Sequence, residues 1–191
     1  MTRFIRHISK HWRTNIDGYN ALHQFSIDQP EAFWDALWDF LEIIGEKGSD
    51  IILDRDALPG ARWFPQARIN FAENHLRRRD EAAALIGRTE SGARRTVSWR
   101  ELYEAVSRLQ QALVAAGFQA GDRVAACLPN TPEAVIGVLG TTSLGGIWSA
   151  CAPEYGEQAL LDRVSTIEPT VLLIADGYTY AGKQFDLRGK A

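Results

Sequence analysis

Apolar and polar residues are arranged differently along two parts of this chain, and the change falls near residue 80. Residues 1–80 are rich in aromatic side chains and contain few strand-like runs. Within them, Pro30 suits a first helical turn and Gly45 suits a helix end, so the apolar spacing between them predicts a helix over 30–44. The apolar stripe of this helix consists of Phe33, Leu37, Phe40, Leu41 and Ile44.

Two tryptophans, Trp34 and Trp38, lie one helical turn apart beside that stripe. Large aromatic side chains dominate buried contacts, so we interpret both as packing residues and not as a ligand platform. The segment LPGARWFPQARINFAEN at 58–74 mixes prolines and a glycine with aromatic residues. This mixture is typical of an ordered but non-regular segment that packs over a core.

The second part of the chain begins with signals for a hairpin and a long helix. Residues 82–86 and 94–97 are short strand candidates, and Glu-Ser-Gly at 90–92 predicts the turn between them. Ser98 and Glu101 have the spacing of a capping box, which predicts a helix that ends at the following glycine, Gly117. One face of that helix carries Leu102, Val106, Leu109, Leu113 and Ala116.

A regular alternation of strands and helices follows this helix. Continuous apolar runs predict strands at 123–128, 147–151 and 171–175, and helical periodicity predicts helices at 131–145 and 156–167. Strands and helices that alternate at this spacing form right-handed βαβ crossovers. We therefore expect a parallel sheet whose strands are covered on both faces.

These patterns together predict an α/β fold. Residues 81–191 would form a three-layer-type parallel sheet with βαβ crossovers, and residues 1–80 would form a mainly helical and irregular N-terminal arm. Ligands of such sheets bind beyond the carboxyl ends of the strands, in this chain at the turns after Leu128, Cys151 and Ala175. Because a three-stranded sheet would leave an edge open, we expect the α/β unit to be incomplete and to continue in a longer parent protein.

Composition narrows the functional classes. Of the 191 residues, 46% are hydrophobic and 24% are charged, as is usual for a soluble globular protein. A formal net charge of −3 gives no reason to expect nucleic acid or an anionic membrane as a partner. The first residues lack the long apolar run of a signal peptide or membrane span, and two cysteines make no disulfide framework. We therefore expect a cytoplasmic location.

Tests for familiar motifs give no complete active site. Neither G-x-G-x-x-G nor G-x-x-x-x-G-K-[ST] occurs in the chain, which argues against a dinucleotide-binding protein and a P-loop protein. Gly-Thr-Thr-Ser at 140–143 lies in an apolar helical run, so we interpret it as helix surface and not as a phosphate loop. His7 and His11 have no companions with zinc-ligand spacing, and we expect an exposed, unstructured N-terminus and no metal site.

Two cysteines and a glutamate lie near the predicted ligand edge. Cys127 and Cys151 each lie near the end of an apolar strand and all histidines are far upstream, so we interpret both as small packing residues and not as nucleophiles. Glu154 has three interpretations: an acid, a charge that suits a helix start, or a loop surface residue. The residues by themselves thus predict an α/β segment with a ligand edge and no catalytic residue.

Three stretches resemble one family over nearly the whole chain. RWFPQARINFAEN at 62–74 resembles the Trp-Phe-Pro-Gly…Asn-Tyr-Ala-Glu-Asn segment of short-chain acyl-CoA synthetases, with Gln66 in place of the usual glycine. The stretches at 121–156 and 160–183 continue this resemblance. Trp148 and Pro-Glu-Tyr-Gly at 153–156 resemble the acetoacetyl-CoA synthetase branch, whereas acetyl-CoA synthetases tend to have histidine at the first place and Gly-Gly at 153–154.

The resemblance implies the N-terminal portion of an adenylate-forming acid–CoA ligase. In this family a carboxylate attacks the α-phosphate of ATP to give an acyl-adenylate and pyrophosphate, and the CoA thiol then displaces AMP. The full-length enzyme would use ATP, Mg²⁺ and CoA, with acetoacetate as the acid. The family's phosphate loop, acyl pocket and catalytic lysine would all lie beyond residue 191. The segment by itself should therefore be inactive and hold no cofactor tightly, and its partners would be the ATP-binding and C-terminal domains of its own chain and small-molecule substrates.

Only positions for CoA binding carry over from the resemblance. In relatives the loop after the second parallel strand forms a wall of the CoA nucleotide pocket, and here that loop is Ala152, Pro153 and Glu154. Two arginines near the CoA phosphates of the acetyl enzyme correspond to Tyr180 and Lys183. Lys183 keeps a charge that can bind phosphate, with simple solvation as the alternative, and the ring of Tyr180 could stack against adenine.

Three other interpretations stay open. A ligase for another short acid, such as acetate or propionate, would share every feature named so far because the acyl pocket lies elsewhere. A stand-alone, non-catalytic binding module would end at a stop codon after residue 191, whereas an enzyme would continue into Ser-Gly-Thr-Thr-Gly-x-Pro-Lys. A redox protein with a Rossmann-like sheet would bind NAD or a flavin in a titration.

Overall fold

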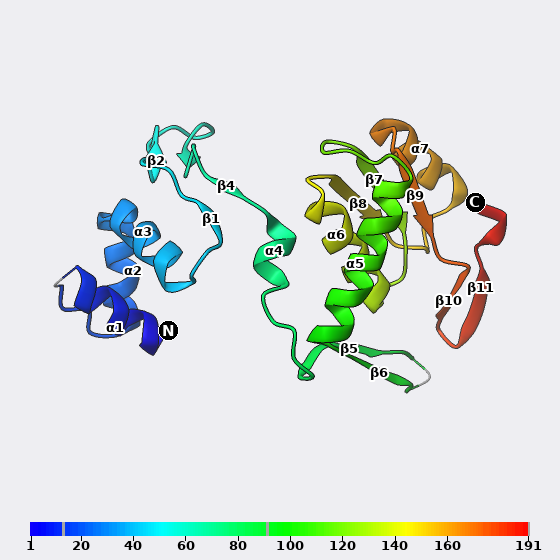
Figure 1. The fold of residues 1–191 in the computed structure, drawn as a ribbon, viewed down its shortest axis with the longest axis horizontal. Helices are drawn as coiled ribbons and strands as arrows, with labels where there is room; N and C mark the ends of the chain where they lie inside the picture. The colour runs from blue at the N-terminus through cyan, green and yellow to red at the C-terminus, as the bar shows by residue number, and fades with distance from the viewer. Residues whose placement is uncertain (13, 91, 191) are drawn as a thin grey trace. The chain divides into compact units, whose positions relative to one another are not determined.

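The computed structural model describes residues 1–12, 14–90 and 92–190, in two compact units that comprise residues 1–69 and 70–191 (Figure 1). Position 91 of the predicted hairpin turn lies outside the described residues. The domain boundary expected between residues 80 and 81 remains a prediction, and the compact units change over between Ile69 and Asn70. Within the described residues, no helix has the length and apolar character needed to cross a membrane.

The first unit packs three helices around an aromatic and aliphatic core. The described elements are α1 (Thr2–His11), α2 (Tyr19–Asp28), α3 (Pro30–Phe40), β1 (Gly45–Glu46), β2 (Ile52–Leu53), β3 (Arg62–Trp63) and β4 (Arg68–Ile69). Phe4 and Ile8 of α1 are buried with Leu22 and Phe25 of α2 and with Ala36 of α3. The strands pair antiparallel as β1 with β4 and β2 with β3.

Two expectations for this unit are wrong. The N-terminus forms helix α1 and is not unstructured, because Phe4 and Ile8 bury one of its faces. Helix α3 ends at Phe40, one turn before the expected end, since Glu42 adopts a left-handed backbone with φ of 51° that interrupts the helical hydrogen bonds. The apolar spacing continues past the core, which leaves Leu41 46% exposed.

Both tryptophans of α3 contact aromatic rings of the segment after β2, although Trp34 stays 37% exposed and only Trp38 is half-buried. The ring of Trp34 lies edge-on to that of Trp63, with 5.2 Å between centroids. The ring of Trp38 lies 5.0 Å from that of Phe64. The non-regular segment after β2 is thereby attached to the helices through aromatic contacts.

The second unit contains the parallel sheet. Its described elements are α4 (Phe71–His75), β5 (Ala83–Arg88), β6 (Arg94–Ser98), α5 (Trp99–Ala115), β7 (Arg123–Cys127), α6 (Pro132–Ser143), β8 (Ile147–Cys151), α7 (Glu157–Ile167), β9 (Val171–Ile174), β10 (Gly177–Tyr180), β11 (Lys183–Asp186) and a 3₁₀ turn at Arg188–Lys190. The expected hairpin of β5 and β6 is antiparallel. The capping box at the start of α5 is also confirmed, because the Glu101 amide donates to the Ser98 hydroxyl and the Glu101 carboxylate accepts from the Ser98 amide.

The sheet has the order β8-β7-β9, and all three strands are parallel, which confirms the predicted α/β class. On one face, Val124 of β7 packs with Leu113 of α5 and with Trp148 of β8. On the other face, Ala125 lies near Leu160 of α7. Helices α5 and α6 thus lie on one side of the sheet and α7 on the other (Figure 1). Only β7 is buried along its length, whereas β8 and β9 are partly exposed, contrary to the expectation that all three strands are covered.

Candidate functional site

A cavity of about 710 Å³ lies at the carboxyl edge of the parallel sheet. Its walls come from the β5–β6 hairpin, the turn after β7, the turn after β8 and strand β10. The turns after Leu128 and Cys151, both predicted as ligand edges, line the cavity directly, and the turn after Ala175 leads into the β10 wall. This volume is in the range of small-molecule sites in proteins.

The turn after β8 brings together the three residues expected to form a wall. Ala152, Pro153 and Glu154 all line the cavity, with Pro153 fully buried and the other two exposed. Next along the chain, the ring of Tyr155 lies 4.6 Å below the guanidinium of Arg163 on α7. A buried proline with fixed φ and a ring contact to the following helix hold this turn in one conformation.

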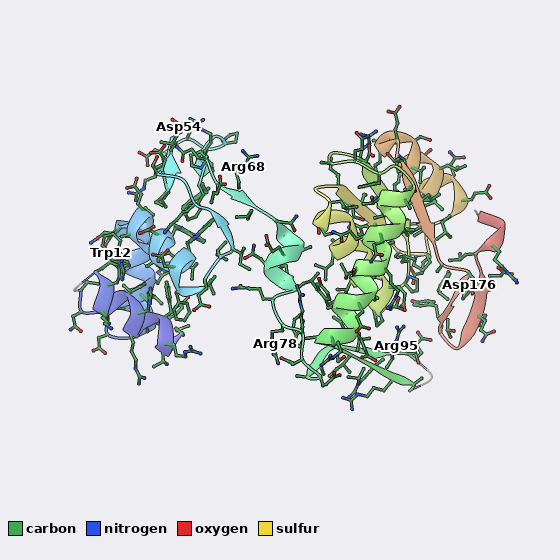
Figure 2. All side chains as sticks on the ribbon, viewed as in Figure 1. Trp12, Asp54, Arg68, Arg78, Arg95 and Asp176 are labelled. Carbon is green, nitrogen blue, oxygen red and sulfur yellow. The ribbon has the colours of Figure 1, made fainter. Side chains whose placement is uncertain are left out.

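The turn after β7 leads into α6 and supplies the opposite wall. Thr131 lines the cavity at the N-cap of α6, and Pro132 occupies the first helical turn. Glu133 pairs with Arg95 of the β5–β6 hairpin, a residue labelled in Figure 2. Partial burial acts to raise the pKa of Glu133, but hydrogen bonds from Arg95, from its own backbone amide and from the Thr131 side chain hold that pKa below its ordinary value.

Tyr180 and Lys183 lie on a hairpin that sequence reasoning did not predict. They are cross-strand partners of β10 and β11, on either side of a turn in which Ala181 and Gly182 have φ of 50° and 72°. Both side chains are exposed, and neither lines the cavity, whereas Gly177 to Thr179 of the same strand do. The structure thus brings Ala152, Pro153 and Glu154 into one wall and places Tyr180 and Lys183 at the tip of a neighbouring wall.

A carboxylate connects this tip to the β5–β6 hairpin. The amide of Ala181 donates to Glu90 Oε1 at 3.2 Å, and the amide of Gly182 donates to Glu90 Oε2 at 3.1 Å. Glu90 itself lines the cavity, as does Arg88 two residues before it. Sequence reasoning missed both residues because charged side chains beside a predicted turn resemble an ordinary solvated surface.

The two cysteines occupy adjacent strands at the cavity edge. Cys127 and Cys151 are register partners of β7 and β8, and neither forms a disulfide. Cys127 is buried, as predicted for a packing residue, whereas Cys151 is half-buried and lines the cavity. Among the described residues, no group of three or more histidine, cysteine, aspartate or glutamate side chains is arranged to hold a metal ion.

Comparison with known proteins places this geometry in a family context. Residues 72–189 match the AMP-binding enzyme family, and residues 19–75 match the acetyl-coenzyme A synthetase N-terminus. The acetoacetyl-coenzyme A synthetase of Rhizobium meliloti (strain 1021) is 45% identical over 190 residues, which cover 100% of this chain and 29% of that protein. The malonamoyl-CoA synthetase vrtB of Penicillium aethiopicum is 35% identical over 191 residues, which cover 96% of this chain and 26% of that protein.

A solved structure matches the fold of nearly the whole chain. The acetoacetyl-CoA synthetase from Streptomyces lividans superposes with a TM-score of 0.91 at 39% sequence identity. The match covers 99% of this chain and 30% of that protein. The chain therefore spans less than a third of the length of the relatives that it matches.

Proposed function

The chain belongs to the AMP-binding enzyme family, and on that premise we propose that it forms the N-terminal part of an ATP-dependent acid–CoA ligase. The proposed enzyme converts acetoacetate, ATP and CoA into acetoacetyl-CoA, AMP and pyrophosphate through an acyl-adenylate. The R. meliloti and S. lividans relatives, both named acetoacetyl-CoA synthetases, support acetoacetate as the acid. We assign the binding sites of ATP with its Mg²⁺ and of the acid to segments of the enzyme outside these residues.

The part that we assign to this chain is a wall of the CoA site. The observation that carries this assignment is the cavity at the carboxyl edge of the sheet, lined by Ala152, Pro153 and Glu154. Its fixed turns and its volume suit a small molecule that is partly apolar and partly polar. Lys183 and Tyr180, at the tip of the adjacent hairpin, would provide a phosphate partner and a ring for stacking against adenine.

The two unlinked cysteines support a cytoplasmic location. Cys127 and Cys151 lie directly opposite each other on neighbouring strands and remain unlinked. Thiols stay reduced in the cytoplasm, where disulfides are rare.

A ligase for a different short acid is the second candidate. The P. aethiopicum relative, named a malonamoyl-CoA synthetase, is 35% identical to this chain, so similar N-terminal segments occur in enzymes named for different acids. The acid can be identified by acid-dependent exchange of pyrophosphate into ATP, measured on the complete gene product with acetoacetate, malonamate, acetate and propionate. We expect exchange with acetoacetate and none from residues 1–191 alone. Exchange only with another acid would identify the second candidate.

The CoA wall is tested by Lys183→Ala in the complete gene product. We expect the KM for CoA to rise about tenfold, which is the low end of the effect of losing a hydrogen bond to a charged group. Pyrophosphate exchange should stay unchanged, because CoA enters after the acyl-adenylate has formed. Lys10→Ala removes an exposed lysine from α1 and serves as the matched control. An unchanged KM for CoA in the Lys183 variant would refute the role of Lys183.

A further inference from the structure

One basic side chain lines the cavity and is not among the positions expected to bind CoA. Arg88 is the last residue of β5, it is exposed, and it is the one basic residue among the described lining residues. We infer that Arg88 is a phosphate-binding residue of this cavity. The inference rests on the proposed CoA site and assigns to it a residue that contacts the ligand's phosphate groups.

The guanidinium of Arg88 takes part in no ion pair: within the described residues, 1–12, 14–90 and 92–190, no carboxylate forms one with it. Other arginines of the same unit are paired: Arg95 with Glu133, Arg100 with Glu81 and Arg78 with Asp80. A guanidinium presents a planar set of donors that matches phosphate oxygens, so an unpaired arginine in a cavity wall is suited to an anionic ligand.

A second arginine lies directly opposite Arg88 in the strand pair. Arg88 and Arg94 are cross-strand partners in the antiparallel β5–β6 pair, and directly opposite residues project from the same face of the pair. Like charges directly opposite each other are destabilising. No described carboxylate pairs with Arg94 either. A bound phosphate would reduce this repulsion between the two guanidinium groups. An anionic ligand would therefore gain binding free energy here that a neutral or cationic ligand would not gain.

The carboxylate nearest to Arg88 along the β5–β6 hairpin has other partners. Glu90 lies two residues further along, but both of its oxygens accept hydrogen bonds from the amides of Ala181 and Gly182. Glu90 therefore joins the turn of the β5–β6 hairpin to that of the β10–β11 hairpin, and its carboxylate forms no ion pair with Arg88. The other acidic lining residue, Glu154, belongs to the turn after β8, on a separate wall.

The inference also fits the arrangement of the two hairpins. Lys183 is an exposed cation at the tip of the β10–β11 hairpin, where it pairs across the strands with Tyr180. Arg88 supplies a cation from the neighbouring hairpin, and Glu90 holds that hairpin against the turn between Tyr180 and Lys183. The phosphate groups would then be bound between Arg88 and Lys183, while the rest of CoA extends along the wall formed by Ala152 to Glu154.

The test compares Arg88→Ala, Arg88→Lys and the charge-matched control Arg108→Ala in the complete gene product. Arg108 is exposed on α5 and does not line the cavity. Calorimetric titration measures the Kd of CoA, dephospho-CoA and inorganic pyrophosphate. We expect Arg88→Ala to raise the Kd of CoA about tenfold, Arg88→Lys to raise it less, and Arg108→Ala to leave it unchanged. The thermal midpoint of the ligand-free Arg88→Ala protein should not fall, because the substitution removes a like-charge contact.

The outcomes separate this inference from the proposed function. Equal CoA affinity in the wild type and in Arg88→Ala would overturn the role of Arg88 and leave the CoA site standing. Binding of pyrophosphate that depends on Arg88, without binding of CoA, would support the phosphate residue and refute the CoA site. A loss of affinity for CoA but not for dephospho-CoA would assign Arg88 to the 3′-phosphate, and an equal loss for both would assign it to the diphosphate. A wild type that binds none of the three probes would overturn both proposals.

Discussion

Replacement of Gly137 by alanine should loosen the contact between α6 and the parallel sheet. Gly137 is buried in α6, and a Cβ atom at this place would lie 2.4 Å from Cη2 and 2.8 Å from Cζ3 of Trp148 on β8. Ordinary contacts between carbon atoms are about 3.5–4.0 Å, so the indole ring would have to move by roughly 1 Å. The ring is packed with Leu113 and Val124, which restricts where it can go.

The expected magnitude is the difference between two effects. Overpacking of a core costs about 1–3 kcal/mol, and alanine in place of a mid-helix glycine returns about 0.5–1 kcal/mol. The net loss of unfolding free energy therefore lies between about 0 and 2.5 kcal/mol, which is at most about a 70-fold change in the unfolding equilibrium. The steric cost should exceed the helical gain because the nearest atoms belong to a ring that cannot bend away.

Native-state hydrogen exchange at the amides of Val124 and Ala126 measures this change. Both residues are buried in β7, so their exchange reports on opening of the second unit independently of the first. Gly189→Ala is the control, since a Cβ atom there would meet nothing within 4 Å, and it should leave the exchange unchanged. The double variant Gly137→Ala/Trp148→Leu should exchange more slowly than the sum of the two single changes in unfolding free energy predicts, because the smaller side chain relieves the contact with the new Cβ atom. Unchanged or slower exchange in Gly137→Ala would refute the steric argument.

Two further predictions concern Asn70 and Asp186. The side-chain amide of Asn70 donates to the carbonyls of Thr142 and Ser143 at 3.3 and 3.1 Å, and its oxygen caps α4. Asn70→Ala should therefore lower the unfolding free energy by about 1–3 kcal/mol, measured by the same exchange assay. Asn70→Ser keeps the cap but not the amide donors, so its loss should be smaller than that of Asn70→Ala. Equal losses in the two variants would contradict the role of the amide donors. Hydrogen bonds from Arg188 lower the pKa of Asp186 to about 2, so its contribution to stability is present above the ordinary value of 3.8 and is lost as the pH falls through 2. A carboxyl NMR titration should give this midpoint in the wild type and a higher one in Arg188→Ala, and identical midpoints would contradict it.

Sequence pattern predicted the elements whose formation depends on local residues. The strand at 147–151 has the predicted bounds, and the capping box at Ser98 specifies the start of α5 through hydrogen bonds within four residues. The order of strands and helices then predicted the parallel sheet, because a helix between two strands returns the chain to the end of the sheet where the first strand began. The position of a ligand edge followed from this topology and not from any single residue.

Sequence pattern failed where distant parts of the chain decide the structure. The two-residue strands β1 to β4 have no periodicity to detect, since each depends on a partner up to 24 positions away, as for Gly45 and Ile69. The helix at 30–44 was predicted too long because its apolar spacing continues beyond the core that it contacts. The β10–β11 hairpin was missed because Ala181, in a left-handed turn conformation, is not a residue typical of that turn.

One part of the candidate site could be predicted from local sequence, and another part depends on distant residues. The wall at Ala152 to Glu154 could be predicted because it directly follows a strand end, and strand ends of a parallel sheet meet at one edge. Arg88 could not be predicted, since an arginine beside a surface turn has the same local pattern whether it is solvated or binds a ligand. What distinguishes it is tertiary: Arg94 stands opposite with the same charge, and Glu90 is engaged by amides more than 90 positions away. A charge becomes a candidate binding residue when the fold gives every nearby counter-charge another partner, and only the three-dimensional structure contains that information.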